Sequence, residues 1–409
     1  MSPDERPGRR VMMVAGEASG DLHGGNLAAA LRRLDPHLTL FGIGGSRMRD
    51  AGVETRFDIS ELAVMGLVEV LRHYRRLRRI LGEMQRLLRE ERPDLLITVD
   101  YPGFNLRLAR HAKRLGIPVL HYISPQVWAW REHRVKQIAE SVDRMAVLLP
   151  FEAPFYERHG IPVRFVGHPL VDEVRAGMER SEAQARFGID PEHPVIGLLP
   201  GSRQGELKRL MPLLLESASR LRQRFPGLQF LLPLASSLKR EEMEAWMEPI
   251  PADRQKKSGI HRYASRHSDP VPITLVEGFG YDVMQCCDLL ITASGTATLE
   301  AALMNVPMVI VYKVSPLTYA IARRMIKLPN VGLVNIVAGE SIVPELIQHR
   351  ARPDAVVAEA EHFLRDPAHA EATREKLAAV REKLGQPGGS ENVARLALEM
   401  LENGRQSAT

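Results

Sequence analysis

The stretch Val11-Met-Met-Val-Ala-Gly-Glu-Ala-Ser-Gly-Asp21 begins as a short apolar run and then breaks into a loop that contains two glycines. A strand-like run followed by a glycine-bearing loop and a helical pattern is typical of the first strand of a parallel α/β sheet. Nucleotide-binding proteins usually hold phosphate in such a loop. Glu17 and Asp21 argue against that ligand here, because two carboxylates would repel a phosphate. The stretch therefore predicts the fold class and leaves the ligand of its loop open.

The same alternation of short apolar runs and longer helical patterns continues along nearly the whole chain. Two sets of strands are predicted, at residues 11–15, 38–43, 95–99, 119–123, 145–149 and 163–166, and at residues 195–199, 229–234, 274–276, 289–292 and 308–311. Two such sets predict an α/β protein with two doubly wound Rossmann-like domains. The length of 409 residues agrees, because one hydrophobic core seldom supports a chain of this size.

The domain boundaries are predicted from composition. Residues 171–194 are rich in charge and end in the turn-forming cluster Asp190-Pro-Glu-His-Pro194, where we place a linker. We therefore expect an N-terminal domain over residues 1–180 and a second domain over residues 181–355. Residues 356–409 show helical patterns only, and we expect this tail to return to the N-terminal domain. A homodimer that exchanges the tail is the alternative.

The bulk composition excludes several classes of protein. A hydrophobic content of 44% and a charged content of 26% are ordinary for a globular chain, and a net charge of +5 is too mild to indicate nucleic-acid binding. The only two cysteines, Cys286 and Cys287, are adjacent, which excludes a disulfide framework and favours a reducing cytoplasm. The polar N-terminus and the short apolar run after it predict neither a secretory signal nor a membrane span.

A basic segment leaves two interpretations open. Between residues 72 and 79 the chain has five arginines, and leucines recur at helical spacing across residues 67–88. This pattern predicts one long helix. Its basic face is either simply solvated or, together with the apolar residues from 62 to 68, forms a surface that meets anionic lipid.

Two loops of the second half have the chemistry that suits a phosphate. In Ile196-Gly-Leu-Leu-Pro-Gly-Ser-Arg203 a buried strand ends in a glycine turn, and Arg203 stands just before a predicted helix. Backbone N–H groups at a helix start and a fixed positive charge together suit a diphosphate. A glycine turn that merely exposes an arginine is the alternative.

The second loop lies in Leu289-Leu-Ile-Thr-Ala-Ser-Gly-Thr-Ala-Thr-Leu-Glu300. The hydroxyls of Ser294, Thr296 and Thr298 and the backbone at Gly295 could hold phosphate oxygens at the start of the next helix. Glu300 could accept two hydrogen bonds from a ribose, as acidic residues do in dinucleotide folds. A well-capped helix packed through its alanines is the alternative.

Other nucleotide and metal chemistries lack their motifs. The sequence has no Walker P-loop, and no G-x-G-x-x-G stands between a strand and a helix. It also has no Asp-x-Asp and no cluster of histidine, cysteine and carboxylate at metal-ligand spacing. We therefore predict no cofactor and no metal site.

Several ungapped motifs together resemble the lipid-A-disaccharide synthase family. They are Gly16-Glu-Ala-Ser-Gly-Asp21, Asp100-Tyr-Pro-Gly-Phe-Asn105, His121-Tyr-Ile-Ser-Pro-Gln-Val-Trp-Ala-Trp-Arg131, Gly167-His-Pro169, Pro200-Gly-Ser-Arg203, Ser294-Gly-Thr-Ala-Thr-Leu-Glu300 and Leu328-Pro-Asn330. The resemblance spans residues 11–348. It implies an inverting glycosyltransferase of the two-Rossmann-domain kind called GT-B, with the nucleotide mainly on the C-terminal domain.

The resemblance also implies the substrates and the place of work. Such an enzyme transfers 2,3-diacylglucosamine from UDP-2,3-diacylglucosamine to lipid X, which is 2,3-diacylglucosamine 1-phosphate, and releases UDP. It works at the cytoplasmic face of the inner membrane of a Gram-negative bacterium, peripherally bound to an anionic surface, which favours the lipid interpretation of residues 62–79. A UDP-sugar epimerase of the same architecture and a non-catalytic UDP-binding module are the rival functions.

Within this framework each candidate residue receives a role. Arg203 is assigned to the diphosphate, residues 294–298 to the phosphates, Glu300 to the ribose, and Asn330 to the nucleotide site. Asp100 is our candidate for the general base, because it directly follows a strand, although it could instead cap a helix or turn. Glu17 is expected to act on the acceptor side or to support the base. Weaker candidates on the acceptor side are Gly16, Gly20 and Asp21, of which Asp21 could instead cap the following helix.

Overall fold

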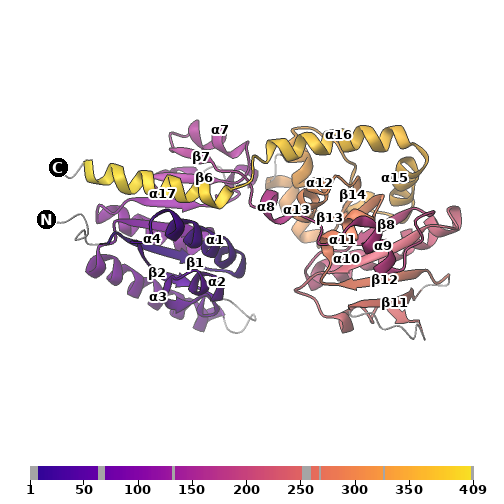
Figure 1. The fold of residues 1–409 in the computed structure, drawn as a ribbon, viewed down its shortest axis with the longest axis horizontal. Coiled ribbons are helices and arrows are strands. Elements are labelled where there is room, and N and C mark those ends of the chain that lie inside the picture. The colour runs from indigo at the N-terminus through magenta and orange to yellow at the C-terminus, as the bar shows by residue number, and fades with distance from the viewer. Residues whose placement is uncertain are drawn as a thin grey trace. The chain divides into compact units, whose positions relative to one another are not determined.

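The computed structural model describes residues 8–62, 70–130, 134–250, 259–266, 269–325 and 328–406. The chain forms two compact units, one made of Met1–Pro169 with Gly385–Thr409 and the other of Leu170–Leu384 (Figure 1). This division is by compactness. The predicted functional domains, which span residues 1–180, 181–355 and 356–409, stay a prediction. Helix α3 covers Val70–Glu91 of the predicted 67–88 helix, and residues 63–69 lie outside the described residues.

The first unit contains a seven-stranded, fully parallel sheet in the order β3-β2-β1-β4-β5-β6-β7. The strand order reverses at β1, whose Ala15 pairs with Val99 of β4. The strands are β1 (Arg10–Ala15), β2 (Thr39–Gly44), β3 (Glu54–Asp58), β4 (Leu95–Val99), β5 (Val119–Tyr122), β6 (Arg144–Val147) and β7 (Val163–Phe165).

Alternate residues of β1 pack on opposite faces of this sheet. Val11, Met13 and Ala15 belong to the core on one face, whereas Met12 and Val14 belong to the core on the other. Helices cover both faces, so the strand is apolar throughout rather than alternating. The helices of the unit are α1 (Ala18–Leu34), α2 (Ser46–Asp50), η1 (Ile59–Glu61), α3 (Val70–Glu91), α4 (Pro102–Arg114), α5 (Val127–Trp130), α6 (Val135–Ala139), α7 (Glu152–Glu157) and α17 (Gly389–Gln406).

The last helix, α17, completes the first unit. It packs along α1 and buries Val393, Leu396 and Leu401 in the same core as Val11 and Met13. Figure 1 shows α17 (yellow) beside the indigo and violet elements of the N-terminal half. The chain enters it closely over residue 167, because a Cβ added to Gly389 would lie 3.1 Å from the Gly167 carbonyl oxygen.

The second unit contains an eight-stranded mixed sheet in the order β10-β11-β12-β9-β8-β13-β14-β15. Only the β10–β11 and β11–β12 pairs are antiparallel. The strand order reverses at β8, which lies between β9 and β13. The strands are β8 (Val195–Leu199), β9 (Gln229–Leu234), β10 (Met247–Pro249), β11 (Ile260–Ser265), β12 (Pro272–Glu277), β13 (Leu289–Ala293), β14 (Met308–Tyr312) and β15 (Glu345–Ile347).

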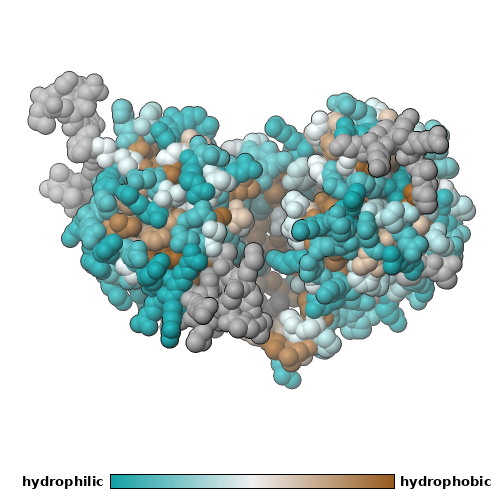
Figure 2. Space-filling view, turned by 90° about the horizontal axis from the view of Figure 1, so that it is seen from below, coloured by the Kyte–Doolittle hydropathy of each residue, from teal (hydrophilic) through white to brown (hydrophobic). Residues whose placement is uncertain are grey.

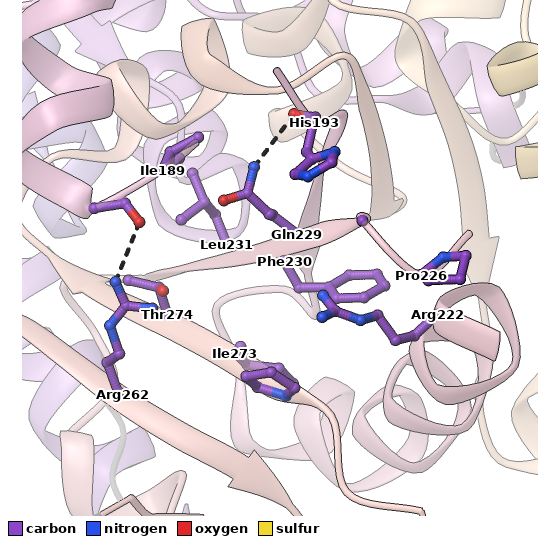
Figure 3. Close-up of a pocket in the computed structure, with 13 residues that line it drawn as sticks. Ile189, His193, Arg222, Pro226, Gln229, Phe230, Leu231, Arg262, Ile273 and Thr274 are labelled. Carbon is purple, nitrogen blue, oxygen red and sulfur yellow. Dashed lines mark hydrogen bonds between the residues drawn. The ribbon is translucent and has the colours of Figure 1, made fainter. Parts of the chain in front are cut away.

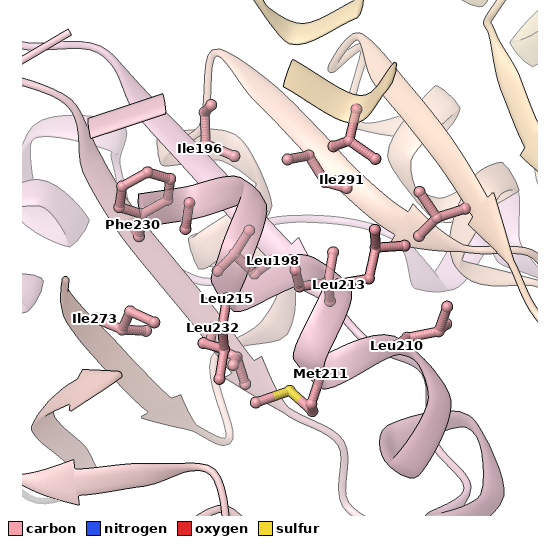
Figure 4. Close-up of a cluster of buried hydrophobic side chains, with 14 of the residues drawn as sticks. Ile196, Leu198, Leu210, Met211, Leu213, Leu215, Phe230, Leu232, Ile273 and Ile291 are labelled. Carbon is pink, nitrogen blue, oxygen red and sulfur yellow. The ribbon is translucent and has the colours of Figure 1, made fainter. Parts of the chain in front are cut away.

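Helix α10 (Gln204–Arg224) carries much of the core of the second unit. Leu207, Leu210, Met211 and Leu214 recur at positions i, i+3, i+4 and i+7 and are all buried. Figure 4 shows side chains of this helix against those of β8 and β13. The other helices are α8 (Leu170–Glu173), α9 (Arg180–Phe187), η3 (Arg240–Glu242), α11 (Gly280–Cys286), α12 (Ala297–Leu303), α13 (Pro316–Met325), α14 (Leu333–Ala338), η4 (Gln348–Arg350), α15 (Pro353–Arg365) and α16 (Pro367–Lys383).

The two sheets confirm the predicted α/β class with two doubly wound domains and a helical C-terminal tail. Four strands escaped the sequence prediction, namely β3, β10, β11 and β15. Each lies at or near an edge of its sheet, where polar residues replace the continuous apolar pattern. No helix in the described part of the chain is long and apolar enough to cross a membrane.

Candidate functional site

Asp100 and Glu17 lie together at the point where the strand order of the first unit reverses. Strands β1 and β4 are parallel neighbours, so the residues that follow Ala15 and Val99 leave the same edge of the sheet. Ligand sites of doubly wound sheets form at such edges. Burial raises the pKa of the Asp100 carboxyl, and although a hydrogen bond from the Tyr101 backbone opposes the shift, the negative charge of Glu17 adds to it. The fold therefore brings Asp100 and Glu17 close together, although they are far apart in sequence.

The backbone at Asp100 adopts an unusual conformation. Asp100 and Tyr101 have φ values of +47° and +46°, which cost non-glycine residues on the order of 1–3 kcal/mol each. Asn105 holds this turn, since its buried Nδ2 donates to the Asp100 carbonyl oxygen at 2.7 Å and to that of Val99 at 3.1 Å. Tyr101, not Asp100, is the N-cap residue of α4, and no side chain caps that helix.

The two glycines of the first loop give the site its close packing. A Cβ added to Gly16 would lie 2.3 Å from Cδ1 of Tyr101, so only glycine allows the tyrosine ring to approach the loop. Gly20 is buried in α1 and lies against Ala15. Both residues therefore contact protein groups in this structure, and their place on the acceptor side stays a prediction.

Asp21 anchors a neighbouring loop. Its carboxylate is only 3% exposed and accepts hydrogen bonds from the backbone N–H groups of Gly45 (2.6 Å), Arg47 (3.0 Å) and Met48 (3.1 Å). These groups form the start of α2, so Asp21 caps that helix although it lies inside α1. Its predicted role toward the acceptor gains no support from these contacts.

Buried polar residues fix the segment that follows β5. Glu152 is almost fully buried and accepts hydrogen bonds from Trp128 Nε1 at 2.9 Å, from the Leu149 backbone at 3.0 Å and from the Ser124 hydroxyl. His121 is fully buried with Nδ1 2.7 Å from the Thr98 hydroxyl, and its burial lowers its pKa to about 4. These contacts give Trp128 and His121 structural roles.

The two predicted phosphate loops lie together at the reversal point of the second unit. Strands β8 and β13 are parallel neighbours, with Leu199 paired to Thr292, so both loops leave the same edge of the sheet. This edge is the ligand edge of a doubly wound sheet. The arrangement brings Arg203 and residues 294–300 to one region of the molecule.

Glu206 modifies what the first loop can bind. Its carboxylate accepts hydrogen bonds from the backbone N–H groups of Ser202 (3.0 Å) and Arg203 (3.3 Å), and it pairs with the Arg203 guanidinium at 3.3 Å. The Arg203 side chain is 82% exposed. A carboxylate of the first helical turn therefore occupies the N–H groups of Ser202 and Arg203, which precede the helix, and the predicted phosphate role of the helix start stays a prediction. Arg203 itself remains accessible.

The hydroxyls of the second loop differ in availability. Thr298 is fully buried and its hydroxyl donates to the Gly295 carbonyl oxygen at 2.8 Å. Half-buried Ser294 donates to the Val331 carbonyl oxygen at 3.2 Å, whereas Thr296 is exposed at the N-cap position of α12. Gly295 has a φ of +154° and faces open space. Thr296 and the Gly295 backbone are therefore the groups best placed to meet a ligand.

Glu300 has neighbours that the sequence did not reveal. Tyr281 donates its hydroxyl to Glu300 Oε1 at 3.2 Å. Burial raises the pKa of Glu300, and the Tyr281 hydrogen bond partly opposes that shift. Burial also raises the pKa of Glu173, to which the charges of Asp172 and Glu300 contribute. Tyr281 and Glu173 stand outside the recognised motifs, so no local signal marks them.

Asn330 belongs to a segment tied to the second loop. Its Oδ1 accepts a hydrogen bond from Ser341 at 2.7 Å, and the residue is 8% exposed. The adjacent Val331 accepts from Ser294 and donates its N–H to Glu345 at 2.8 Å. Asn330 therefore lies next to the loop that begins at Ser294, but its Oδ1 atom already accepts a hydrogen bond within the protein.

The match to a known family spans almost all of the chain. The family model described as lipid-A-disaccharide synthetase matches residues 11–399. The chain belongs to this family. A lipid-A-disaccharide synthase from Geobacter metallireducens is 56% identical over 395 residues, covering 97% of this chain and 98% of that protein. One from Anaeromyxobacter dehalogenans is 44% identical over 392 residues, covering 96% and 97%. The resemblance read from the motifs is confirmed.

Solved structures show that this family member has the GT-B fold. The chain resembles the calicheamicin glycosyltransferase CalG4 with a TM-score of 0.56 at 15% identity, covering 96% of this chain and 98% of that one. It also resembles a putative UDP-N-acetylglucosamine 2-epimerase from Listeria monocytogenes, with a TM-score of 0.60 at 13% identity and 97% coverage of both chains. Transferases and epimerases share this architecture, so the fold alone does not choose between them.

A cavity of about 310 Å³ in the second unit lies away from the family's motifs (Figure 3). Gln229 and Pro272, which begin β9 and β12, line it, together with His193 from the loop before β8. It is therefore at the amino ends of these strands, opposite the edge that carries Arg203 and Ser294. Among the described residues, no group of three or more histidine, cysteine or acidic side chains is arranged to hold a metal ion.

Proposed function

We propose that the protein is a lipid-A-disaccharide synthase that transfers 2,3-diacylglucosamine from UDP to the 6-hydroxyl of 2,3-diacylglucosamine 1-phosphate. The observation that carries the proposal is the identity of 56% to such a synthase over nearly the full length of both chains. The candidate site supports it independently, since the first unit presents a carboxylate pair and the second presents an accessible arginine beside a hydroxyl-bearing loop.

Asp100 is proposed as the general base. As the 6-hydroxyl oxygen of the acceptor attacks C1 of the donor sugar, its proton passes to the Asp100 carboxylate. The C1–O bond to UDP breaks, and its electron pair leaves on the phosphate oxygen. Attack from the opposite side inverts the configuration at C1 and gives the β-1,6 linkage. The raised pKa of Asp100 suits this role, because a desolvated carboxylate binds the proton more strongly.

The second unit is proposed to bind UDP. The exposed guanidinium of Arg203 is available to the diphosphate, and Thr296 with the Gly295 backbone is available to its phosphate oxygens. Glu300, whose second carboxylate oxygen has no bond to Tyr281, is assigned to the ribose hydroxyls. Asn330 is assigned to the same nucleotide site, since its neighbour Val331 accepts a hydrogen bond from Ser294. The arginine then stabilises the negative charge that develops on departing UDP. The proposal assigns no part of this task to a metal or a cofactor.

A mass assay of purified protein tests the proposal. With UDP-2,3-diacylglucosamine and lipid X, we expect disaccharide 1-phosphate and UDP in equal amounts, with the same rate in EDTA. With the donor alone, we expect no turnover. Epimerised or hydrolysed donor in the absence of acceptor would support the rival epimerase, and loss of activity in EDTA would contradict the metal-free mechanism.

We further propose that the protein binds an anionic bilayer, at the cytoplasmic face of the inner membrane. On α3, Arg75 and Arg79 are exposed, as expected for a basic surface within the predicted 62–79 contact. On α13, Leu317 and Ile321 are 73% and 52% exposed and lie one turn apart on one helical face. Hydrophilic side chains cover most of the face shown in Figure 2, whereas neighbouring exposed apolar side chains can mark a site of protein or membrane contact.

Co-flotation with vesicles containing an anionic phospholipid tests this contact. We expect binding at low ionic strength that weakens in about 1 M salt, where the Debye length is only about 3 Å. Ile321→Ser should reduce binding, while half-buried Ala322→Ser, which points away from the face of Leu317 and Ile321, is the matched control. If Ile321→Ser binds vesicles as well as the control variant, α13 does not take part in the membrane contact. If neutral vesicles bind as well as anionic ones, the contact is not selective for anionic lipid.

The possible homodimer stays a prediction. Sedimentation velocity measures the oligomeric state directly.

A further inference from the structure

A second cavity adjoins the residue that follows the candidate base. It lies between α3 and α4 in the first unit and has a volume of about 290 Å³. Leu77, Leu81 and Phe104 form apolar walls, and the ring of Tyr101 forms another. The same ring contacts the first loop, where it fits closely against Gly16. The cavity is therefore connected through one aromatic side chain to both Asp100 and the loop that carries Glu17.

Two arginines give the cavity a positive rim. Arg78 of α3 and Arg107 of α4 both line it and both are exposed. Nearby arginines of these helices are paired, Arg79 with Glu83 at 3.5 Å and Arg110 with Glu140 at 3.8 Å. Within the described residues, neither Arg78 nor Arg107 forms an ion pair. Their charges are thus available to an external anion.

Resting on the proposed function, we propose that this cavity binds the acceptor, with an acyl chain against the apolar walls and the 1-phosphate at Arg78 and Arg107. Apolar walls with a few charged groups are typical of ligand sites. The volume of about 290 Å³ lies just below the usual range of about 300–1,000 Å³, so the cavity holds part of one chain rather than the whole diacyl sugar. The guanidinium is well suited to phosphate, because it can donate two parallel hydrogen bonds.

Gly103 provides a way to fill the cavity without disturbing the fold. A Cβ at this position would meet nothing within 4 Å, and the residue has no positive φ that would exclude a side chain. It lies near the start of α4 and lines the cavity. Gly103→Leu should therefore fold normally and occupy the space that we assign to the acyl chain.

Acceptor kinetics in detergent test the assignment. For Arg78→Ala and Arg107→Ala, we expect KM for lipid X to rise roughly tenfold with KM for the UDP-sugar unchanged, the effect of losing a charged hydrogen bond. Arg107→Lys should recover part of the loss. For Gly103→Leu, we expect the preference for long-chain over short-chain acceptors to shrink by a similar factor. Arg114→Ala, an exposed arginine of α4 outside the cavity, is the matched control.

Two further measurements separate the possible failures. If the wild-type protein transfers sugar but Arg78→Ala, Arg107→Ala and Gly103→Leu all keep the wild-type KM and chain-length preference, the acceptor site is elsewhere. If the wild-type protein transfers nothing, the proposed function fails, and direct titration with detergent-dispersed lipid X decides the cavity assignment alone. Variants that lose only their binding to anionic vesicles would assign the arginines to the bilayer and overturn the acceptor site.

Discussion

At the scale of single residues, the carboxylate of Asp100 is the group on which transfer is expected to depend. Asp100→Asn retains the size of the side chain and its place in the strained turn, but it removes the proton acceptor. We expect kcat to fall by about 10²–10⁴-fold, the usual contribution of a general base. UDP affinity, measured by calorimetry, should stay at the wild-type value. A variant that transfers sugar at the normal rate would exclude Asp100 as the base.

The neighbouring Glu17 should raise the pH at which Asp100 loses its proton. Asp100 must be deprotonated to accept a proton, so kcat/KM should fall as the pH drops through its pKa. Burial and the charge of Glu17 both raise that pKa, which places the acidic limb above the ordinary aspartate value of about 3.9. Glu17→Gln removes the repelling charge, so the limb should move to lower pH. A limb that stays in place would show that Glu17 does not act through Asp100.

The candidate residues that the sequence could place are those in the loops that follow parallel strands. Glu17, Asp100, Arg203 and Ser294 follow four parallel strands, and the edge on which strand ends meet is dictated by sheet topology. Asn105, Glu206 and Tyr281 were missed as site residues. The contacts of Asn105 and Glu206 depend on the exact path of a turn, and that of Tyr281 depends on how the fold places two separate helices, α11 and α12. No spacing rule contains that information.

At the scale of elements, α17 should determine the stability of the first unit. Leu396 is fully buried among residues of the β1 face, so Leu396→Ala leaves a cavity and should lower the free energy of unfolding by about 2–5 kcal/mol. Arg395→Ala removes an exposed ion pair to Glu391 on the same helix and should change it by less than about 1 kcal/mol. Urea denaturation followed by circular dichroism measures both, and equal midpoints would contradict this role.

The elements that could be predicted are the buried central strands and the long amphipathic helices. Strands β1, β4, β8 and β13 are apolar on both faces because helices cover both faces, and this leaves an unmistakable sequence pattern. Strands such as β3 and β10 have polar, partly exposed residues and owe their conformation to one neighbouring strand. Their pairing partners supply the information that their own sequences lack.

At the scale of the whole molecule, stabilisation by UDP should depend on residues of the second unit and not on Asp100. All of the residues that we propose to bind UDP lie in the second unit, whereas Asp100 lies in the first. UDP at 100 times its Kd should stabilise the native protein by about 2.7 kcal/mol and raise its Tm. Asp100→Asn should show the same rise, and Arg203→Ala should need more UDP to reach it. Differential scanning calorimetry measures the shifts, and a normal response of Arg203→Ala would remove this residue from the diphosphate site.

The chain leaves the first unit after Pro169 and re-enters it at Gly385. During synthesis, the strands of that unit thus emerge well before the helix that covers one face of their sheet. At about 5–20 residues per second, the delay is on the order of ten to forty seconds. Throughout this time, apolar residues such as Leu27 and Leu31 lack their partners on α17. A premature stop codon near the 3′ end of the message would therefore damage the half of the protein that was made first.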